Sequence, residues 1–379
     1  MAKNDNLTDY LVDLADAIRT KKGITRKINA QDFASEILSI ESGGGGDTPV
    51  PTPSWTGHAD AEGLKAIGWD DDDIAYYQAN GVNWNQEDDE YHKVTDDNKA
   101  LYGLLTASNI SSYRDRIVYL PKIDISGKTS LNSLFYNCTS LVAIPLLDTQ
   151  NVTNMGSMFN NCYSLASVPL LNTQKVTTMS STFNGCYSLA HVPLFDTQNV
   201  TNMGSMFYNC YSLTQVPLFN TQKVTSMGSM FYNCYSLVSI PLFDTQNVTN
   251  MDSMFRSCYS LVSFPLVDTQ KVTNMGSMFG NCYSLMSVPL LSTQKVTSMS
   301  SMFSNCASLT TVKLKNVTQS YQFNNSSKLS KESLLFLINN ESATSAITIK
   351  LNSYAYTRLA TDADIVSALS KHSKISISQ

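Results

Sequence analysis

The sequence predicts an α/β solenoid of 24-residue rungs, with small helical segments before it and an α/β cap after it. Two spacings predict this fold. All eight cysteines lie 24 residues apart, from Cys138 to Cys306, and prolines keep the same step from Pro145 to Pro289. A fixed period of this size is typical of stacked repeats, because one unit cannot bury its apolar residues alone and neighbouring units can.

Each rung offers two apolar segments to a common core. Leu165, Val168 and Leu170 follow the L-x-x-L-x-L spacing of a repeat strand, so we expect all three to point inward. The V-T-x-M-x-x-M-F stretch before each cysteine would form the opposite wall. Pro169 lacks the N–H that a central strand needs, which predicts a short strand with incomplete pairing.

The cysteines are predicted to be buried free thiols. Disulfide-rich domains are small and lack a large core, whereas these cysteines recur like Leu and Phe within long apolar ladders. Zinc sites need clustered spacings such as C-x-x-C, and the sequence has none. The four histidines are scattered, and no nucleotide or acyl-transfer motif occurs. We therefore expect no enzyme activity, no cofactor and no metal.

Composition limits the partners. The net charge is −5 with 15% charged residues, so no basic stripe is available for nucleic acid. No apolar run approaches the ~18 residues of a membrane span, and the N-terminus does not resemble a secretory signal. We expect that the protein does not insert into a membrane and that it is made in a cytoplasm.

Residues 1–40 are predicted to be a helical segment for anchoring and oligomerisation, because they form two short amphipathic helices over 6–22 and 30–40. A self-packed hairpin is the alternative. The candidate attachment residues are Leu7, Leu11, Leu14, Ile18, Phe33 and Ile37. Residues 41–54 (ESGGGGDTPVPTPS) are a Gly/Pro linker.

Residues 55–130 are predicted to hold an acidic helical domain and the solenoid's N-terminal cap. Residues 55–100 carry twelve acidic and three basic side chains, and GWDDDDIAYYQ at 68–78 is echoed by NWNQEDDEYHK at 83–93. Asp70 and Asp73 have the spacing of a helix capping box. A calcium loop would need alternating ligands, a Gly turn and a distal Glu, which this run lacks.

The solenoid is expected over 131–312 and the α/β cap over 313–379. The cap should contain helices at 330–340 and 362–371 and strands at 347–351 and 375–378. It would close the last rung, as solenoids require.

Two columns are candidate binding surfaces. One tyrosine per rung gives an aromatic column about 25 Å long at ~4.8 Å per rung, which either contacts a glycan or protein or stabilises the stack. The next column includes three phenylalanines one residue past the supposed inner leucine, so we expect it to point outward. These candidates are Tyr163, Tyr187, Tyr211, Tyr235, Tyr259, Tyr283, Phe195, Phe219 and Phe243.

Two further patterns concern the rung surface. The column two residues before each cysteine varies freely, which indicates exposure. Successive rungs also alternate between DTQN and NTQK, as at 148–151 and 172–175, so the copied unit is predicted to be 48 residues long.

The pattern V-T-x-M-x-x-M-F-x-x-C-x-S-L-x-x-V-P-L over residues 131–312 resembles the BspA-like leucine-rich repeats of bacterial surface proteins. That resemblance implies a solenoid that binds host or neighbour-cell macromolecules without catalysis. The flanks, such as LTDYLVDLADAIRTKKG, W-D-D-D-D-I and LSKESLLFLINN, resemble phage and prophage proteins of gut bacteria, including virion appendages (fibres).

These resemblances together predict a phage virion fibre or receptor-binding protein. Its N-terminus would bind other virion proteins, its solenoid would bind a bacterial cell-surface glycan or protein, and it would form a homo-oligomer, with a trimer as one option. The alternative is a bacterial surface adhesin located on the cell surface rather than in the virion.

Overall fold

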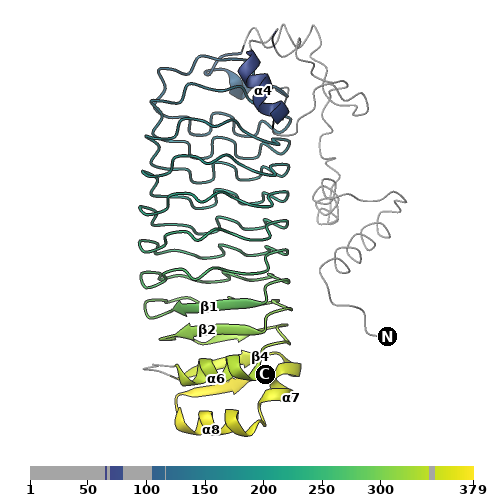
Figure 1. Ribbon diagram of the computed structural model, residues 1–379, viewed down its shortest axis with the longest axis vertical. Helices are drawn as coiled ribbons and strands as arrows, with labels where there is room; N and C mark the ends of the chain where they lie inside the picture. Colours follow the sequence, from purple (N-terminus) through teal and green to yellow (C-terminus); the bar gives the residue numbers. More distant parts are fainter. Residues whose placement is uncertain (1–64, 66–68, 80–104, 116, 341–345) are drawn as a thin grey trace, which may run out of the picture. The chain divides into compact units, whose positions relative to one another are not determined.

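The computed structural model describes residues 65, 69–79, 105–115, 117–340 and 346–379 (Figure 1). The chain divides into two compact units, residues 1–104 and 105–379. The helices expected over 6–22, 30–40 and 83–93, and the linker at 41–54, lie outside the described residues.

In the first unit, helix α4 (Asp71–Ala79) begins where the capping pattern predicts. The Asp73 amide donates to the Asp70 carboxylate at 2.9 Å, and the Asp70 amide donates back to the Asp73 carboxylate at 3.1 Å. This reciprocal pair satisfies two amides that the first helical turn leaves without partners. The capping interpretation of the aspartate run is therefore confirmed.

The second unit is a stack of rungs that follows the short 3-10 helix η1 (Ile110–Ser112) (Figure 1). Isolated parallel bridges join residues 24 apart, for example Asn154 to Thr178 and Thr178 to Asn202. Extended pairing of the Leu-rich segment appears in the last rungs, where β1 (Ser287–Ser292) pairs with β2 (Thr311–Lys315). Their register shifts between Val288 and Leu290, on either side of the proline.

The Met- and Phe-containing wall of each rung is a chain of tight turns. In one rung, Ser157 and Phe159 donate their amides to the next rung, to the carbonyls of Ser180 at 2.9 Å and Thr182 at 2.8 Å. Ser157 and Asn161 have positive φ angles of 52° and 62°. Asn adopts this left-handed conformation more readily than most residues. The polar appearance of these segments therefore reflects turn-forming residues between buried ones.

The core consists of ladders of equivalent apolar side chains, of which the Phe and Cys columns are uniform. The Phe column from Phe135 to Phe303 stacks with centroid separations of 5.3 to 6.0 Å. From Cys162 onward, each thiol donates to a Phe carbonyl of the preceding rung at 3.0 to 3.2 Å. All eight cysteines are free and buried, as predicted, and burial raises the pKa of Cys306 to about 12.

The alternation between rungs has a physical basis at one corner of the solenoid. The Lys223 ammonium donates to the Asn199 amide oxygen of the preceding rung at 2.8 Å, and Asn199 donates to the Gln174 carbonyl at 2.9 Å. The pair Lys175 and Asn151 repeats the first contact at 3.0 Å. Because asparagine alternates with lysine from Asn151 to Lys271, the ammonium groups of this part of the column are two rungs apart, which reduces their repulsion.

The C-terminal region forms a second parallel sheet in the order β3-β4-β5. Its elements are β3 (Tyr321–Phe323), α6 (Lys331–Asn339), β4 (Ile347–Leu351), α7 (Ser353–Leu359), α8 (Ala363–Lys371) and β5 (Ile375–Ser378). The helices α6 and α8 and the strands β4 and β5 lie where the sequence predicts them. The short elements β3 and α7 were not predicted.

Helix α6 covers the open edge of β2. The Ser333 hydroxyl donates to the Val312 carbonyl at 3.0 Å and accepts from the Val312 amide at 2.8 Å. Phe323 and Ser326 continue core columns past the last cysteine: the Phe323 ring stacks on Phe303 at 5.2 Å, and the Ser326 hydroxyl donates to the Phe303 carbonyl at 2.9 Å. Covering an unpaired strand edge prevents it from pairing with another chain.

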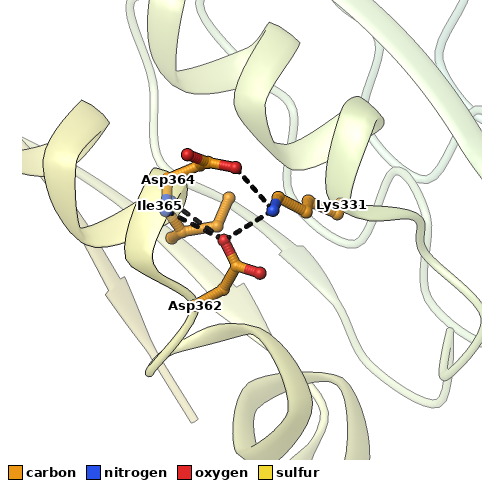
Figure 2. A network of polar contacts seen from close by, with 4 residues as sticks. All are labelled: Lys331, Asp362, Asp364 and Ile365. Atoms are coloured by element: carbon orange, nitrogen blue, oxygen red, sulfur yellow. Dashed lines mark hydrogen bonds and ion pairs between the residues drawn. The ribbon is translucent and has the colours of Figure 1, made fainter.

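A polar cluster holds α6 to α8, as Figure 2 shows. The Lys331 ammonium contacts Asp362 at 3.0 Å and Asp364 at 2.6 Å. Asp362 also caps α8 by accepting from the Asp364 amide at 3.0 Å and the Ile365 amide at 3.4 Å. Lys331 lowers the pKa of the Asp362 carboxyl below its ordinary value through the hydrogen bond it donates.

Candidate functional site

In the L-x-x-V-P-L segments, the buried position after the proline lies one residue later than the sequence predicts. Leu165 and Val168 are buried as expected, but Leu170 is 55% exposed and Leu171 is 3% exposed. In two rungs this segment closes a three-residue turn at the proline: the Phe195 amide donates to the Pro193 carbonyl at 3.0 Å, and the Phe219 amide donates to the Pro217 carbonyl at 3.0 Å. Such a turn interrupts strict in-and-out alternation, so the central leucine points outward and the next residue inward.

The phenylalanine column is therefore part of the core, and the prediction that it points outward is wrong. Phe195, Phe219 and Phe243 are only 2% to 3% exposed. Phe219 stacks with Phe207 at 6.3 Å and with Phe243 at 6.4 Å between ring centroids. These side chains are too deeply buried to contact a partner.

The tyrosine column exists as a continuous ring stack. Neighbouring rings from Tyr163 to Tyr283 lie 4.5 to 5.1 Å apart, and the last pair is tilted by 41°. Tyr211 and Tyr235 are buried, while Tyr163, Tyr187, Tyr259 and Tyr283 are half-buried. Each ring covers the face of the next, so the geometry favours a role in stabilising the stack over contact with a partner.

The exposed apolar column is one of leucines, here called the Leu stripe. It was missed because the repeat-strand template assigns this position to the core. Exposed fractions run from 50% to 64% over six members and fall to 36% at the last. The members are Leu146, Leu170, Leu194, Leu218, Leu242, Leu266 and Leu290.

Lysines replace leucine at both ends of the Leu stripe. Lys122 follows Pro121 as Leu146 follows Pro145. At the other end, Lys313 is the register partner of Leu290, and its ammonium lies 5.8 Å from the centroid of the Phe336 ring. Both lysines are exposed. The apolar surface thus has a defined length, about 29 Å for seven leucines at ~4.8 Å per rung.

The column two residues further along each rung borders the Leu stripe and holds aspartate in four of the seven rungs; these aspartates are called the Asp border. Its carboxylates are exposed, and that of Asp196 accepts from the Gln198 backbone amide at 3.1 Å and side-chain amide at 3.2 Å. These neutral donors leave the negative charge in place. Within the described residues, no ion pair involves the four members, which are Asp148, Asp196, Asp244 and Asp268.

A smaller polar and aromatic cluster lies in the freely varying column before the cysteines. Tyr208 stacks on Tyr232 at 4.6 Å, and the Arg256 guanidinium lies 5.5 Å from the Tyr232 centroid. All three are half-buried. Because the ring faces contact one another, this cluster offers mainly ring edges to a ligand.

The candidate attachment residues Leu7, Leu11, Leu14, Ile18, Phe33 and Ile37 lie outside the described residues. In the part of the chain that is described, no helix is long and apolar enough to cross a bilayer. No group of three or more His, Cys, Asp or Glu side chains there has the geometry to hold a metal ion.

The repeats of this chain match a known protein family. Residues 129–239 and 237–334 match the family described as "Mycoplasma protein of unknown function, DUF285", and the two matches together span more than half of the chain. The chain belongs to this family. The matched region contains all seven leucines of the Leu stripe. A search of curated proteins found no match.

Two bacterial leucine-rich repeat proteins of known structure are similar. One from T. pallidum is 22% identical, with 51% of this chain and 77% of that chain covered and a TM-score of 0.29. One from Eubacterium ventriosum ATCC 27560 is 16% identical, with 59% and 81% covered and a TM-score of 0.29.

Proposed function

We propose that this chain is a non-enzymatic binding protein of a phage virion, a fibre or receptor-binding protein. Its solenoid would contact a bacterial surface through the Leu stripe and the columns beside it. The observation that supports a binding role is the Leu stripe itself. An exposed row of seven large apolar side chains is costly in water and is typical of an interaction surface.

The core supports a structural role for the rest of each rung. The thiols are buried and bonded to carbonyls, and the Met, Phe and Val ladders are packed against one another. Burial raises the pKa of these thiols, which lowers their reactivity because the thiolate is the nucleophile.

The virion assignment rests on the resemblance of the flanking segments to phage appendage proteins. Residues 1–40 would bind other virion proteins and hold copies of the chain together, and 41–54 would extend the solenoid away from the particle. A bacterial surface adhesin, the alternative function, would use the same Leu stripe and differ in location.

Mass spectrometry of density-purified phage particles from the source culture tests the location. The proposal expects peptides of this chain at stoichiometric level in the particles. Deleting residues 1–40 should abolish incorporation while leaving the solenoid folded. Finding the chain on intact bacteria and not in particles would overturn the virion proposal in favour of the adhesin. Particles that still carry the truncated chain would overturn the attachment role of residues 1–40.

A further inference from the structure

We propose that the Leu stripe binds an amphipathic α-helix of a protein partner, with apolar residues against the leucines and lysine or arginine residues against the Asp border. The inference rests on the proposed binding function and adds the chemistry of the partner. It follows from three features of the face: its length, its end charges and the spacing of its carboxylates.

The length of the stripe suits a helix of moderate size. Seven leucines at ~4.8 Å per rung extend over about 29 Å, which a helix covers with about 19 residues at 1.5 Å each. The neighbouring outer columns hold Pro, Ala, Ser, Thr, Val, Met, Gln and one histidine, His191. Such a surface offers apolar contact and few directional hydrogen bonds, as an apolar helix face requires.

The spacing of the Asp border matches a helical period. Asp148, Asp196 and Asp244 occupy alternate rungs, so their carboxylates repeat at about 10 Å. Seven helical residues rise about 10.5 Å, so one basic residue per heptad would meet successive carboxylates while the apolar positions of each heptad face the leucines. The basic residues of the partner are inferred from the four exposed aspartates, which lack ion pairs within the described residues.

The end charges disfavour a second copy of this chain as the occupant. Two stripes of equal length placed face to face by a two-fold axis would bring a lysine of one copy against a lysine of the other at both ends. This holds for parallel and antiparallel arrangements, since Lys122 and Lys313 both take leucine positions. Opposed like charges oppose that pairing.

The test is a binding titration of the full chain against a fluorescent 21-residue peptide with two leucines and one arginine per heptad, used below its self-association concentration. We expect saturable binding measured by anisotropy. A peptide with glutamate in place of arginine should bind at least about tenfold more weakly, because it faces the Asp border with like charge. Raising the salt to 1 M should remove most of this difference.

Two surface variants locate the site. Replacing Leu194, Leu218 and Leu242 with Ser should weaken binding by roughly tenfold for each leucine, since each loses apolar contact on binding. Replacing Asp196 and Asp244 with Asn should weaken it by about three- to tenfold in total. The second variant is expected to fold, because Asn172 and Asn220 occupy the same column in other rungs. The matched control, Lys175→Asn with Lys223→Asn, removes charges from another column and should not weaken binding.

Binding that is unchanged in both the Leu and the Asp variants would overturn the proposal, as would equal affinity for the Arg and Glu peptides. Sedimentation of the free chain tests the alternative occupant, a second copy of the chain. A dimer of the wild-type chain that is absent in the Leu variant would show that a second copy occupies the Leu stripe. If the peptide does not bind but particles carrying the Leu variant no longer adsorb to cells, this inference fails while the proposed function stands. If adsorption and peptide binding are both unaffected, both fail.

Discussion

A pair of adjacent substitutions tests the orientation of the segment after the proline. Phe219 is 2% exposed and its ring stacks between Phe207 and Phe243, so Phe219→Ala leaves a cavity in the ladder. Such a change costs about 3–5 kcal/mol. Leu218 is 59% exposed, so about two-fifths of its side chain is buried, and Leu218→Ala should cost about 0.8 kcal/mol if full burial of Leu is worth ~2 kcal/mol.

Urea unfolding of the full chain, followed by circular dichroism, measures both free energies of unfolding. Unfolding of repeat arrays can be sub-global, so midpoints and slopes are compared together. Phe219→Leu is the matched control, because Leu171 and Leu291 occupy this column naturally; it should cost about 1 kcal/mol. A Leu218→Ala variant that loses as much stability as Phe219→Ala would refute the assigned orientation.

Three further predictions concern the thiols, the alternating corner and the cap. The eight thiols should not react with a thiol reagent at pH 8 in the native protein, because they are buried and their pKa values are raised, and all eight should react in urea. Rapid labelling of the native protein would contradict this. Asn199→Lys should lower Tm, because it places lysines in three successive rungs, and added salt should restore most of the lost stability. The control that combines Lys175→Asn with Asn199→Lys should lower Tm less. A decrease in Tm that does not depend on salt would rule out charge repulsion as the cause. Lys331 holds the pKa of Asp362 below its ordinary value, so that carboxylate stabilises the cap above about pH 4 and ceases to do so as the pH falls through its folded pKa. In the Asp362→Asn variant, Tm should therefore fall less steeply between pH 5 and 2 than in the wild type. An unchanged slope of Tm against pH would contradict this.

Much of the fold follows from the sequence because a repeat presents each environment several times. Cysteine in every rung indicates a buried column, and the structure places those thiols beneath Phe carbonyls. The capping pair of Asp70 and Asp73 is a local signal, decided by residues three apart, and it was predictable for that reason.

The candidate site was harder to predict, because a departure from strict alternation after the proline decides its orientation. Leu218 and Phe219 are both apolar, and neither composition nor spacing says which is inward. In the rungs of Phe195 and Phe219 an amide-to-carbonyl bond closes a turn at this point, and in β1 the register shifts there. Likewise, the Ser and Asn residues with positive φ resemble an irregular loop in sequence, although they repeat the same turn in every rung.

The Asn–Lys contacts at the corner have a consequence for how such an array changes length by recombination. Adding or deleting two rungs preserves every contact, whereas a single-rung event brings residues of like charge into neighbouring rungs. The alternation is not kept in the last rungs, where Asp244 is followed one rung later by Asp268, and Lys271 by Lys295. Gene variants of this array should therefore differ mainly by multiples of 48 codons.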